Sequence, residues 1–196
     1  ANGNGIFLTG NETANVNINE NKILANSQNG IQIDALAYSN NQIFNNTVSA
    51  NSFGAYVSTN ATTNINRNSI LDNIVGVFYD QGIDHVAYYN DIYGNILGMN
   101  VSAQAIVNAT YNFWGDRTGP NHELLNPTGR GNPVGGNGTN LDFLFFLTNW
   151  ANAVNTPPTA QILADRTLVS PSQTVMFFAT NSSDEGHIDW YNFNFD

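Results

Sequence analysis

The stretch NSILDNIVGVFYDQGIDHVAYYNDIYGNILG, residues 68–98, contains one pattern twice. Its opening, NSILDNIVG, returns 22 residues later as NDIYGNILG, with asparagine, apolar and glycine residues at the same offsets. A repeat of about 20–50 residues indicates stacked structural units, each of which buries its apolar face against its neighbours. The fold therefore depends on how far this repeat extends along the chain.

The repeat extends through three columns of equivalent positions. One column is a glycine that precedes a short apolar segment, and the other two are asparagines. The columns are Gly5, Gly30, Gly54, Gly76 and Gly98; Asn21, Asn46, Asn68, Asn90 and Asn112; and Asn26, Asn51, Asn73 and Asn95. The glycines are 25, 24, 22 and 22 residues apart. Columns that keep one phase over about five copies predict a solenoid.

Within each copy the apolar residues alternate, as in Ile31 and Ile33 or Val77 and Tyr79. Short alternating segments, separated by Asn, Gly and Ser and without a helical period, predict several β-strands per copy. Stacked copies, or rungs, give an all-β fold, a right-handed parallel β-helix with apolar columns inside. The asparagines are predicted to lie at corners, to hydrogen-bond from rung to rung, and to adopt a left-handed backbone there.

The pattern N-x-I-x-x-N-x-x-G-[IVM] resembles the repeats of known parallel β-helix proteins. These are secreted carbohydrate-active proteins, bacterial and archaeal surface proteins, and a periplasmic copper-processing family. The resemblance covers roughly residues 4–120 and implies a β-helix domain over residues 1–120 with about five rungs. It implies little about activity, because this fold carries lyases, hydrolases, adhesins and inert scaffolds.

Residues 121–154 are expected to form a capping or exit segment. The region 108–147 is rich in Gly, Pro and Asn and is similar to the N-x-W-G…G-P…N-P exit segment of surface β-helices. Trp114 is predicted to plug the last rung. The open edge of that rung is predicted to be covered by Phe143, Leu144, Phe145, Phe146 and Trp150.

A second domain is expected over residues 155–196. The paired prolines of NTPPTAQI mark the boundary. The sequence after them resembles the first half of a polycystic-kidney-disease (PKD) type immunoglobulin-like domain. The resemblance rests on Ser182, Asp184, Gly186, Ile188, Tyr191, Phe193 and Phe195. A β-sandwich of this type needs about 100 residues, so the domain is expected to be incomplete, either because the protein continues or because another chain supplies strands.

Composition excludes several classes of function. Charged residues make up 10% of the chain and the net charge is −10, so a nucleic acid would be repelled. There is no cysteine for disulfides or thiolate metal sites, and no apolar run reaches the roughly 20 residues of a membrane span. N-x-S/T sequons favour an extracellular or cell-surface glycoprotein. The sequons begin at Asn11, Asn45, Asn60, Asn100, Asn108, Asn137 and Asn181.

The outward face of the first strand in each rung is the candidate glycan site. Phe7, Tyr56 and Phe78 fall in one outward column, and Asp34 and Asp80 fall in the next. Aromatic rings stack on sugars, and carboxylates bond hydroxyl groups or do acid–base work. Two rungs separate the aspartates, which predicts roughly 9–10 Å between them, at the wide end of the range for inverting glycosidases. The alternative is a solvated or subunit-covered sheet that binds no glycan.

Calcium is the one cofactor that the sequence suggests. Asp80, Asp84 and Asp91 lie close together in the sequence beside a histidine and could supply oxygen ligands, as could Asp184 and Glu185 in the second domain. The alternative is that these are turn carboxylates that bond their own backbone. Copper would require Met or His clusters, and two Met and three dispersed His do not provide one.

These features predict a segment of an extracellular protein with a structural or adhesive role in an envelope, S-layer, sheath or filament. Its expected partners are other surface-protein subunits or glycans. One alternative is a carbohydrate-binding or carbohydrate-active module, and another is a self-assembling filament subunit completed by donor-strand exchange. The sequence favours a role without catalysis and leaves an activity of the acidic face open.

Overall fold

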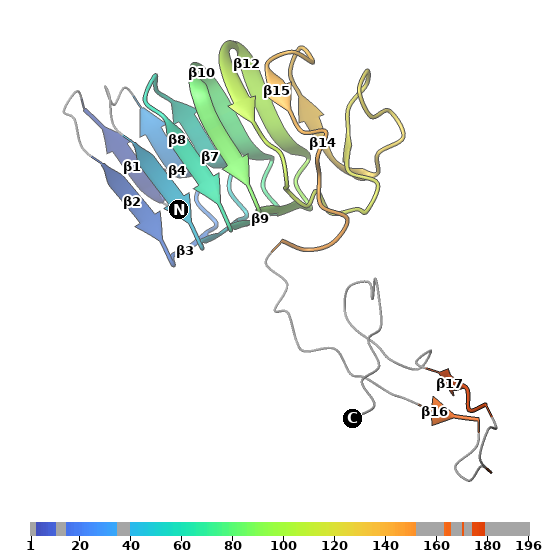
Figure 1. The fold of residues 1–196 in the computed structure, drawn as a ribbon. Coiled ribbons are helices and arrows are strands. Elements are labelled where there is room, and N and C mark those ends of the chain that lie inside the picture. Colours follow the sequence, from blue (N-terminus) through green and yellow to red (C-terminus); the bar gives the residue numbers. More distant parts are fainter. Residues whose placement is uncertain are drawn as a thin grey trace. The chain divides into compact units, whose positions relative to one another are not determined.

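The computed structural model describes residues 3–10, 15–34, 40–151, 163–165, 170 and 174–178. The chain divides into two compact units, Ala1–Asn152 and Ala153–Asp196. The first unit is a parallel β-solenoid, as the repeat predicts, and Figure 1 shows its strands stacked in sequence order from β1 toward β12. The described residues contain strands and turns but no helix.

Three stacks of parallel strands form the walls of the solenoid. The first wall runs through β1 (Ile6–Thr9), β4 (Asn29–Asp34), β7 (Phe53–Ser58), β10 (Val75–Tyr88) and β12 (Leu97–Asn108). The second wall runs through β2 (Val16–Asn19), β5 (Asn41–Phe44) and β8 (Thr63–Asn66) to the later half of β10. The third wall runs through β3 (Lys22–Leu24), β6 (Thr47–Ser49), β9 (Ser69–Leu71) and β11 (Asp91–Tyr93). β10 is long because it continues from the first wall into the second.

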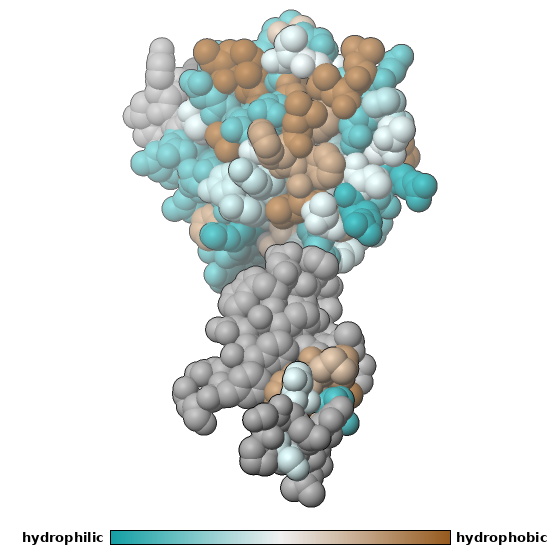
Figure 2. Space-filling model, turned by 45° about the vertical axis from the view of Figure 1, so that its right-hand side comes forward, coloured by the Kyte–Doolittle hydropathy of each residue, from teal (hydrophilic) through white to brown (hydrophobic). Residues whose placement is uncertain are grey.

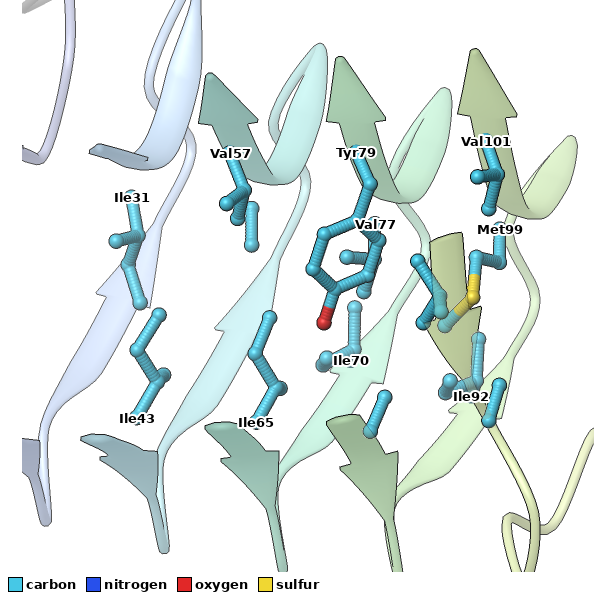
Figure 3. Packing of buried hydrophobic residues seen from close by; sticks show 14 of the residues in the cluster. Ile31, Ile43, Val57, Ile65, Ile70, Val77, Tyr79, Ile92, Met99 and Val101 are labelled. Atoms are coloured by element: carbon cyan, nitrogen blue, oxygen red, sulfur yellow. The ribbon is translucent and has the colours of Figure 1, made fainter. Parts of the chain in front are cut away.

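Columns of apolar side chains fill the interior in the register that the repeat predicts. In the third wall Ile23 pairs with Val48, Val48 with Ile70, and Ile70 with Ile92. All four are at most 7% exposed. Figure 3 shows such side chains pointing inward from successive rungs. Each column is thus buried by the rungs above and below it, which makes the repeat itself the source of the core.

The asparagine columns form two hydrogen-bond ladders along the corners. In each ladder, every asparagine except the last donates both its backbone N–H and its side-chain Nδ2 to Oδ1 of the asparagine in the next rung, at 2.9–3.1 Å. The ladders are Asn21, Asn46, Asn68, Asn90 and Asn112, and Asn26, Asn51, Asn73, Asn95 and Asn132. Most of these amides also donate to main-chain carbonyls, as buried polar groups require.

The prediction of a left-handed backbone at the ladder asparagines is wrong by one residue. The residue before the asparagine makes the turn instead, at every ladder position except Asn132. These residues have φ between 54° and 58° and are Glu20, Ala25, Asn45, Ala50, Arg67, Asp72, Tyr89 and Tyr111. Gly94, with φ of 69°, takes this place before Asn95. The asparagine itself must aim its N–H and Nδ2 at the next rung, so the chain reverses one position earlier.

The glycine column has a steric cause. A Cβ on Gly54 would lie 2.5 Å from the carbonyl oxygen of Gly76, and a Cβ on Gly76 would lie 2.4 Å from that of Gly98. Gly5 and Gly30 meet the next glycine oxygen in the same way, at 2.6 and 2.7 Å. None of these four glycines has a positive φ, so close approach of the rungs, not backbone conformation, selects glycine here.

The exit segment forms a last, irregular rung. β14 (Gly131–Gly135) pairs with the first part of β12, and β15 (Leu141–Asp142) pairs with its end. Leu147 then pairs with Phe113 beside the third wall. The segment predicted to be a cap therefore continues the stacking of the solenoid before it closes it.

Asn132 continues the second ladder after an excursion of the chain over residues 115–130. It accepts hydrogen bonds from the backbone N–H and the Nδ2 of Asn95. The excursion includes β13 (Pro120–Asn121), which pairs with β14. Sequence periodicity missed Asn132, because the excursion shifts it away from the offset that the earlier ladder positions share.

Two of the aromatic residues predicted to cap the solenoid are buried in its core. Trp114 and Phe143 are 0% exposed and belong to the core. Phe146 packs against the same core and is partly buried. These three side chains close the apolar interior at the last rung.

The remaining predicted cap residues meet the open edge mainly through the backbone of their segment, because Tyr111 N–H donates to the carbonyl of Phe145 and Leu147 N–H donates to that of Asn112. Leu144 and Phe145 are 54% and 67% exposed, because a rung-like segment can turn only part of its side chains inward. Trp150 lies on the third wall instead, with its ring centroid 4.6 Å from that of Tyr93 and 4.8 Å from that of Phe113. Figure 2, which brings the exit end of the solenoid forward, shows apolar side chains gathered on its surface.

The second unit is described only in part. β16 (Leu163–Ala164) and β17 (Phe177–Phe178) pair in antiparallel fashion, with Leu163 opposite Phe178. β17 lies within residues 174–178, inside the region where the sequence predicts a second domain. The residues that carry the resemblance to a PKD domain lie outside the described residues, so that assignment stays a prediction.

The hydroxyl of Tyr79 gives a first testable prediction. Tyr79 is 0% exposed, its pKa is raised by burial, and its hydroxyl has no hydrogen-bond partner among the described residues. It stands between Val57 and Val101 in an otherwise aliphatic column. Tyr79→Phe removes an unpaired buried hydroxyl, so we expect the free energy of unfolding to rise by about 1 kcal/mol in urea titrations.

The control is Tyr56→Phe, which removes a hydroxyl that donates to Asp80 at 3.2 Å and is expected to bring no gain in stability. A loss of stability in Tyr79→Phe would show that the buried hydroxyl of Tyr79 is bonded in the folded protein.

Candidate functional site

The outward face of the first wall carries the predicted glycan-binding residues. Phe7 pairs with Gln32, Gln32 with Tyr56, and Tyr56 with Phe78, so the predicted column is formed. Gln32 accepts a hydrogen bond from Asn29 Nδ2 at 2.8 Å and occupies the position between Phe7 and Tyr56. The structure therefore brings Tyr56 and Phe78 together and leaves Phe7, which is 51% exposed, on the far side of Gln32.

A third ring, which the sequence analysis missed, joins Tyr56 and Phe78. The ring centroid of Phe53 lies 5.7 Å from that of Tyr56 and 5.8 Å from that of Phe78, and the last two are 5.4 Å apart. Phe53 precedes its glycine marker, in a column where Asn29 and Val75 are its neighbours. The equivalent positions of the neighbouring rungs are not aromatic, so the repeat gives no sign that Phe53 belongs with Tyr56 and Phe78. We call Phe53, Tyr56 and Phe78 the aromatic cluster.

Asp80 borders the aromatic cluster at a β-bulge. The register of β10 shifts between Tyr79 and Gln81, so that Ser58 is opposite Gln81 and Asp80 is the extra residue. Its Oδ2 accepts hydrogen bonds from the hydroxyls of Tyr56 at 3.2 Å and Ser58 at 3.1 Å. The bulge thus aims a carboxylate along the outer face, next to an aromatic ring.

Asp34 lies in the same outward column as Ser58, one rung away from it. The predicted alignment of Asp34 with Asp80 is therefore interrupted by the bulge. The pKa of Tyr56 is raised, first by burial and then by the charges of Asp80 and Asp34, so both carboxylates act on this phenol. The rings of the aromatic cluster can stack on a sugar ring, and the carboxylates can accept hydrogen bonds from the sugar hydroxyls.

A second set of aromatic rings lies at the corner beside the first ladder. The ring of Tyr89 stacks on that of Tyr111 at 5.9 Å, and Tyr111 stacks on Phe145 at 6.4 Å. Tyr89 and Tyr111 are 40% and 48% exposed. Tyr89 and Tyr111 both occupy the left-handed corner position, so the stacking of successive rungs brings their rings together. Phe145 comes from the exit segment.

The three aspartates predicted to bind calcium are placed on different walls. Asp80 faces outward in the first wall, Asp84 is exposed on the later half of β10, and Asp91 lies in β11. Asp91 Oδ1 accepts a hydrogen bond from Ala151 N–H at 2.6 Å. No group of three or more His, Cys, Asp or Glu able to hold a metal ion occurs among the described residues. Asp184 and Glu185 lie outside them, so calcium there stays a prediction.

The structure separates the sequons by exposure. The asparagines whose side chains are open to solvent are Asn45, Asn60, Asn108 and Asn137, and Asn100 is half-buried. At Asn108 and Asn137 the Oδ1 accepts a hydrogen bond from the threonine hydroxyl of the same sequon, at 2.8 Å in both cases. Asn11 and Asn181 lie outside the described residues. Use of any sequon stays a prediction.

One protein family matches residues 1–136 of the 196-residue chain, and it is described as periplasmic copper-binding protein (NosD). The match covers more than half of the chain. The chain belongs to the NosD family. Membership agrees with the parallel β-solenoid, and the periplasmic family agrees with an envelope location in a broad sense. No curated protein and no solved structure matches the chain. Among the described residues, no helix has the length and apolar character of a membrane span.

His85 is the histidine of this NosD-family chain to consider first as a copper ligand, because it lies within the solenoid wall. Both of its ring nitrogens are hydrogen-bonded to backbone groups. It is 2% exposed, and its ring centroid lies 4.8 Å from that of Tyr79. Its Nδ1 accepts the backbone N–H of Thr63 at 3.2 Å. Nε2 therefore carries the proton and donates to the carbonyl of Gln81 at 2.7 Å. Burial lowers the pKa of His85, although the charge of Asp84 opposes this in part.

The other donors that copper prefers do not complete a site. His122 is 6% exposed, and its Nδ1 accepts the backbone N–H groups of Leu124 and Leu125. Met99 is 0% exposed in the core, and the chain has no cysteine. The other methionine, Met176, is 54% exposed in the second unit. The described residues of the solenoid therefore do not fit a copper centre, which needs several soft or imidazole donors around one point.

His85 predicts a loss of stability in acid. Because its folded pKa lies below the unfolded value of about 6.5, the neutral ring stabilises the fold fully above that value. This contribution is lost as pH falls through about 6.5 toward the lower folded pKa, because the unfolded chain then binds the proton more tightly. The urea concentration at the midpoint of unfolding of the wild type should therefore decrease as the pH is lowered from about 8 to about 5.

The matched variant is His85→Asn, which keeps a side-chain acceptor but cannot titrate, and its urea midpoints should fall less over the same interval. An equal fall in both proteins would assign the pH dependence to other groups.

Proposed function

We propose that this NosD-family chain is a structural or adhesive module of the cell envelope or cell surface, with the solenoid as a stiff rod. The observation that carries the proposal is the pair of asparagine ladders, which bond rung to rung through the length of the solenoid. Buried, fully bonded polar networks rigidify a structure. The periplasmic location of the family supports an envelope role.

The second unit extends this proposal. Residues 155–196 are proposed to be part of a PKD-like domain that links the rod to other surface subunits. The antiparallel pairing of β16 with β17 supports a β-domain there. An open sheet edge in such a domain can accept a further strand from another subunit.

The experiment that tests the structural role starts from the native envelope. Intact mass and negative-stain microscopy of the extracted protein should show an envelope-associated assembly rather than a dispersed monomer. Asn68→Ala, which interrupts a ladder, should weaken the assembly, whereas Tyr56→Ala on the outer face should leave it intact. A dispersed monomer that is unaffected by either change would contradict the structural role.

Glycan binding by the aromatic cluster is a second candidate function. The observation that favours it is the cluster of three rings on an outer face, one of which, Tyr56, donates a hydrogen bond to the carboxylate of Asp80. Affinity electrophoresis in gels containing neutral polysaccharides should show retardation that Phe78→Ala abolishes. Tyr111→Ala, which removes an exposed ring at a corner of the solenoid, away from the first wall, is the control and should behave as the wild type. Retardation unchanged in Phe78→Ala would remove this face from consideration.

A further inference from the structure

Copper sites in proteins without cysteine depend on imidazole nitrogens and thioether sulfurs. In a neutral imidazole one ring nitrogen carries a proton, and only the other offers a lone pair to a metal ion. Whether a histidine can hold copper therefore depends on where that lone pair already points.

In His85 the lone pair points at the backbone of the preceding rung. It lies on Nδ1, which accepts the N–H of Thr63. The opposite nitrogen is covered as well, because it donates to Gln81 and a Cβ on Gly82 would lie only 2.4 Å from it. An ion at either nitrogen would have to displace a buried main-chain hydrogen bond, which leaves a polar group unpaired in the core.

The hydrogen bond to His85 has the same form as the bonds of the asparagine ladders. It lies at the third corner of the solenoid, where the first wall passes into the second. In a ladder, the backbone N–H of Asn46 donates to the side chain of Asn68 in the next rung. At the third corner, the backbone N–H of Thr63 donates to the side chain of His85 in the next rung. The imidazole thus replaces a ladder amide, and its role is to fix one rung to the next.

His122 is engaged in the same way within the excursion. Its Nδ1 accepts two backbone N–H groups, those of Leu124 and Leu125, at 3.2 Å each. Its ring packs against Phe143 with centroids 5.4 Å apart. The lone pair of this ring therefore closes a turn that covers the last rung.

The thioether of the solenoid is enclosed by apolar side chains. Figure 3 shows the sulfur of Met99 inside the solenoid, near Val101 and Ile92, and Met99 is 0% exposed. A copper ion there would be surrounded by hydrocarbon, without the further donors or charge compensation that a buried ion needs.

We infer that the solenoid of this chain does not hold copper, and that His85 and His122 serve as main-chain caps. In this respect the chain differs from its family, which is described as copper-binding. Its solenoid contains imidazoles, but they hydrogen-bond to backbone groups. His187 lies outside the described residues and is not part of the inference. The inference is independent of whether the rod has a structural or a glycan-binding role.

The test uses the full 196-residue chain, with ¹⁵N-labelled histidine followed by NMR during additions of Cu(II). Both rings should show the neutral tautomer with the proton on Nε2, and their signals should stay sharp at an equimolar amount of copper. Competition for Cu(I) against a chromophoric chelator should give the same result for the wild type and for His122→Asn.

Two outcomes with bound copper can be told apart. Stoichiometric binding that broadens the signals of His85 or His122, or that is lost in His122→Asn, overturns the inference. Binding that is lost only in His187→Ala, with both solenoid signals sharp, supports it and assigns the ion to the second unit. The NMR measurement is made on the wild type, so the result stands even if His122→Asn fails to fold.

Discussion

Asn68→Ala is expected to lower the free energy of unfolding by roughly 3–5 kcal/mol. Asn68 is 0% exposed in the middle of the first ladder. Its Oδ1 accepts both the N–H and the Nδ2 of Asn46, and its own Nδ2 donates to the carbonyl of Ile43 as well as to Asn90. Alanine leaves these buried donors and acceptors without partners, and each costs about 1–3 kcal/mol.

The matched control is Asn21→Ala, at the N-terminal end of the same ladder. Asn21 is exposed and donates to Asn46 without being enclosed between two rungs, so its loss should cost less than about 1 kcal/mol. Urea unfolding measures both variants. Hydrogen exchange should show that protection in Asn68→Ala falls first in the rungs on either side of position 68, since stability in a solenoid is shared between neighbours. Equal losses for the two variants would mean that burial of the ladder contributes little.

The ladders show why the fold could be predicted from the sequence. A column such as Ile23, Val48, Ile70 and Ile92 recurs because each rung presents the same environment to the next. Periodicity in the sequence therefore translates directly into strand register. The same reasoning correctly placed the asparagines at corners, because an amide that both donates and accepts is what a corner between stacked rungs requires.

Features that occur once could not be predicted in this way. Asn132 completes a ladder only because the excursion returns to the stack, and the offset of the repeat gives no sign of it. The bulge at Asp80 and the ring of Phe53 each belong to a single rung, so the composition of the candidate site was found only in part. In the sequence, His85 stands out only as a neighbour of the candidate calcium ligands, and nothing there indicates that it bonds Thr63 in space.

Gly76→Ala is expected to destabilise the solenoid by roughly 3 kcal/mol or more. The added Cβ would lie 2.4 Å from the carbonyl oxygen of Gly98 and 3.2 Å from Nδ2 of Asn95. The first contact is with backbone, which cannot rotate away as a side chain can. To relieve it, the two rungs must separate, and separation weakens the hydrogen bond from Asn73 to Asn95 beside them. One methyl group thus acts on both the core and the second ladder.

Gly3→Ala is the control for the loss of glycine itself. There the nearest atom to a new Cβ is Oε1 of Gln28 at 3.2 Å, at the end of a flexible side chain, and the effect should stay within about 1 kcal/mol. Thermal and urea unfolding of the two variants distinguish steric exclusion from backbone entropy. If Gly76→Ala were as stable as Gly3→Ala, the rungs would be free to move apart, and the glycine column would not set their spacing. If it is strongly destabilised, the close approach of Gly76 to Gly98 is what holds the second ladder at bonding distance.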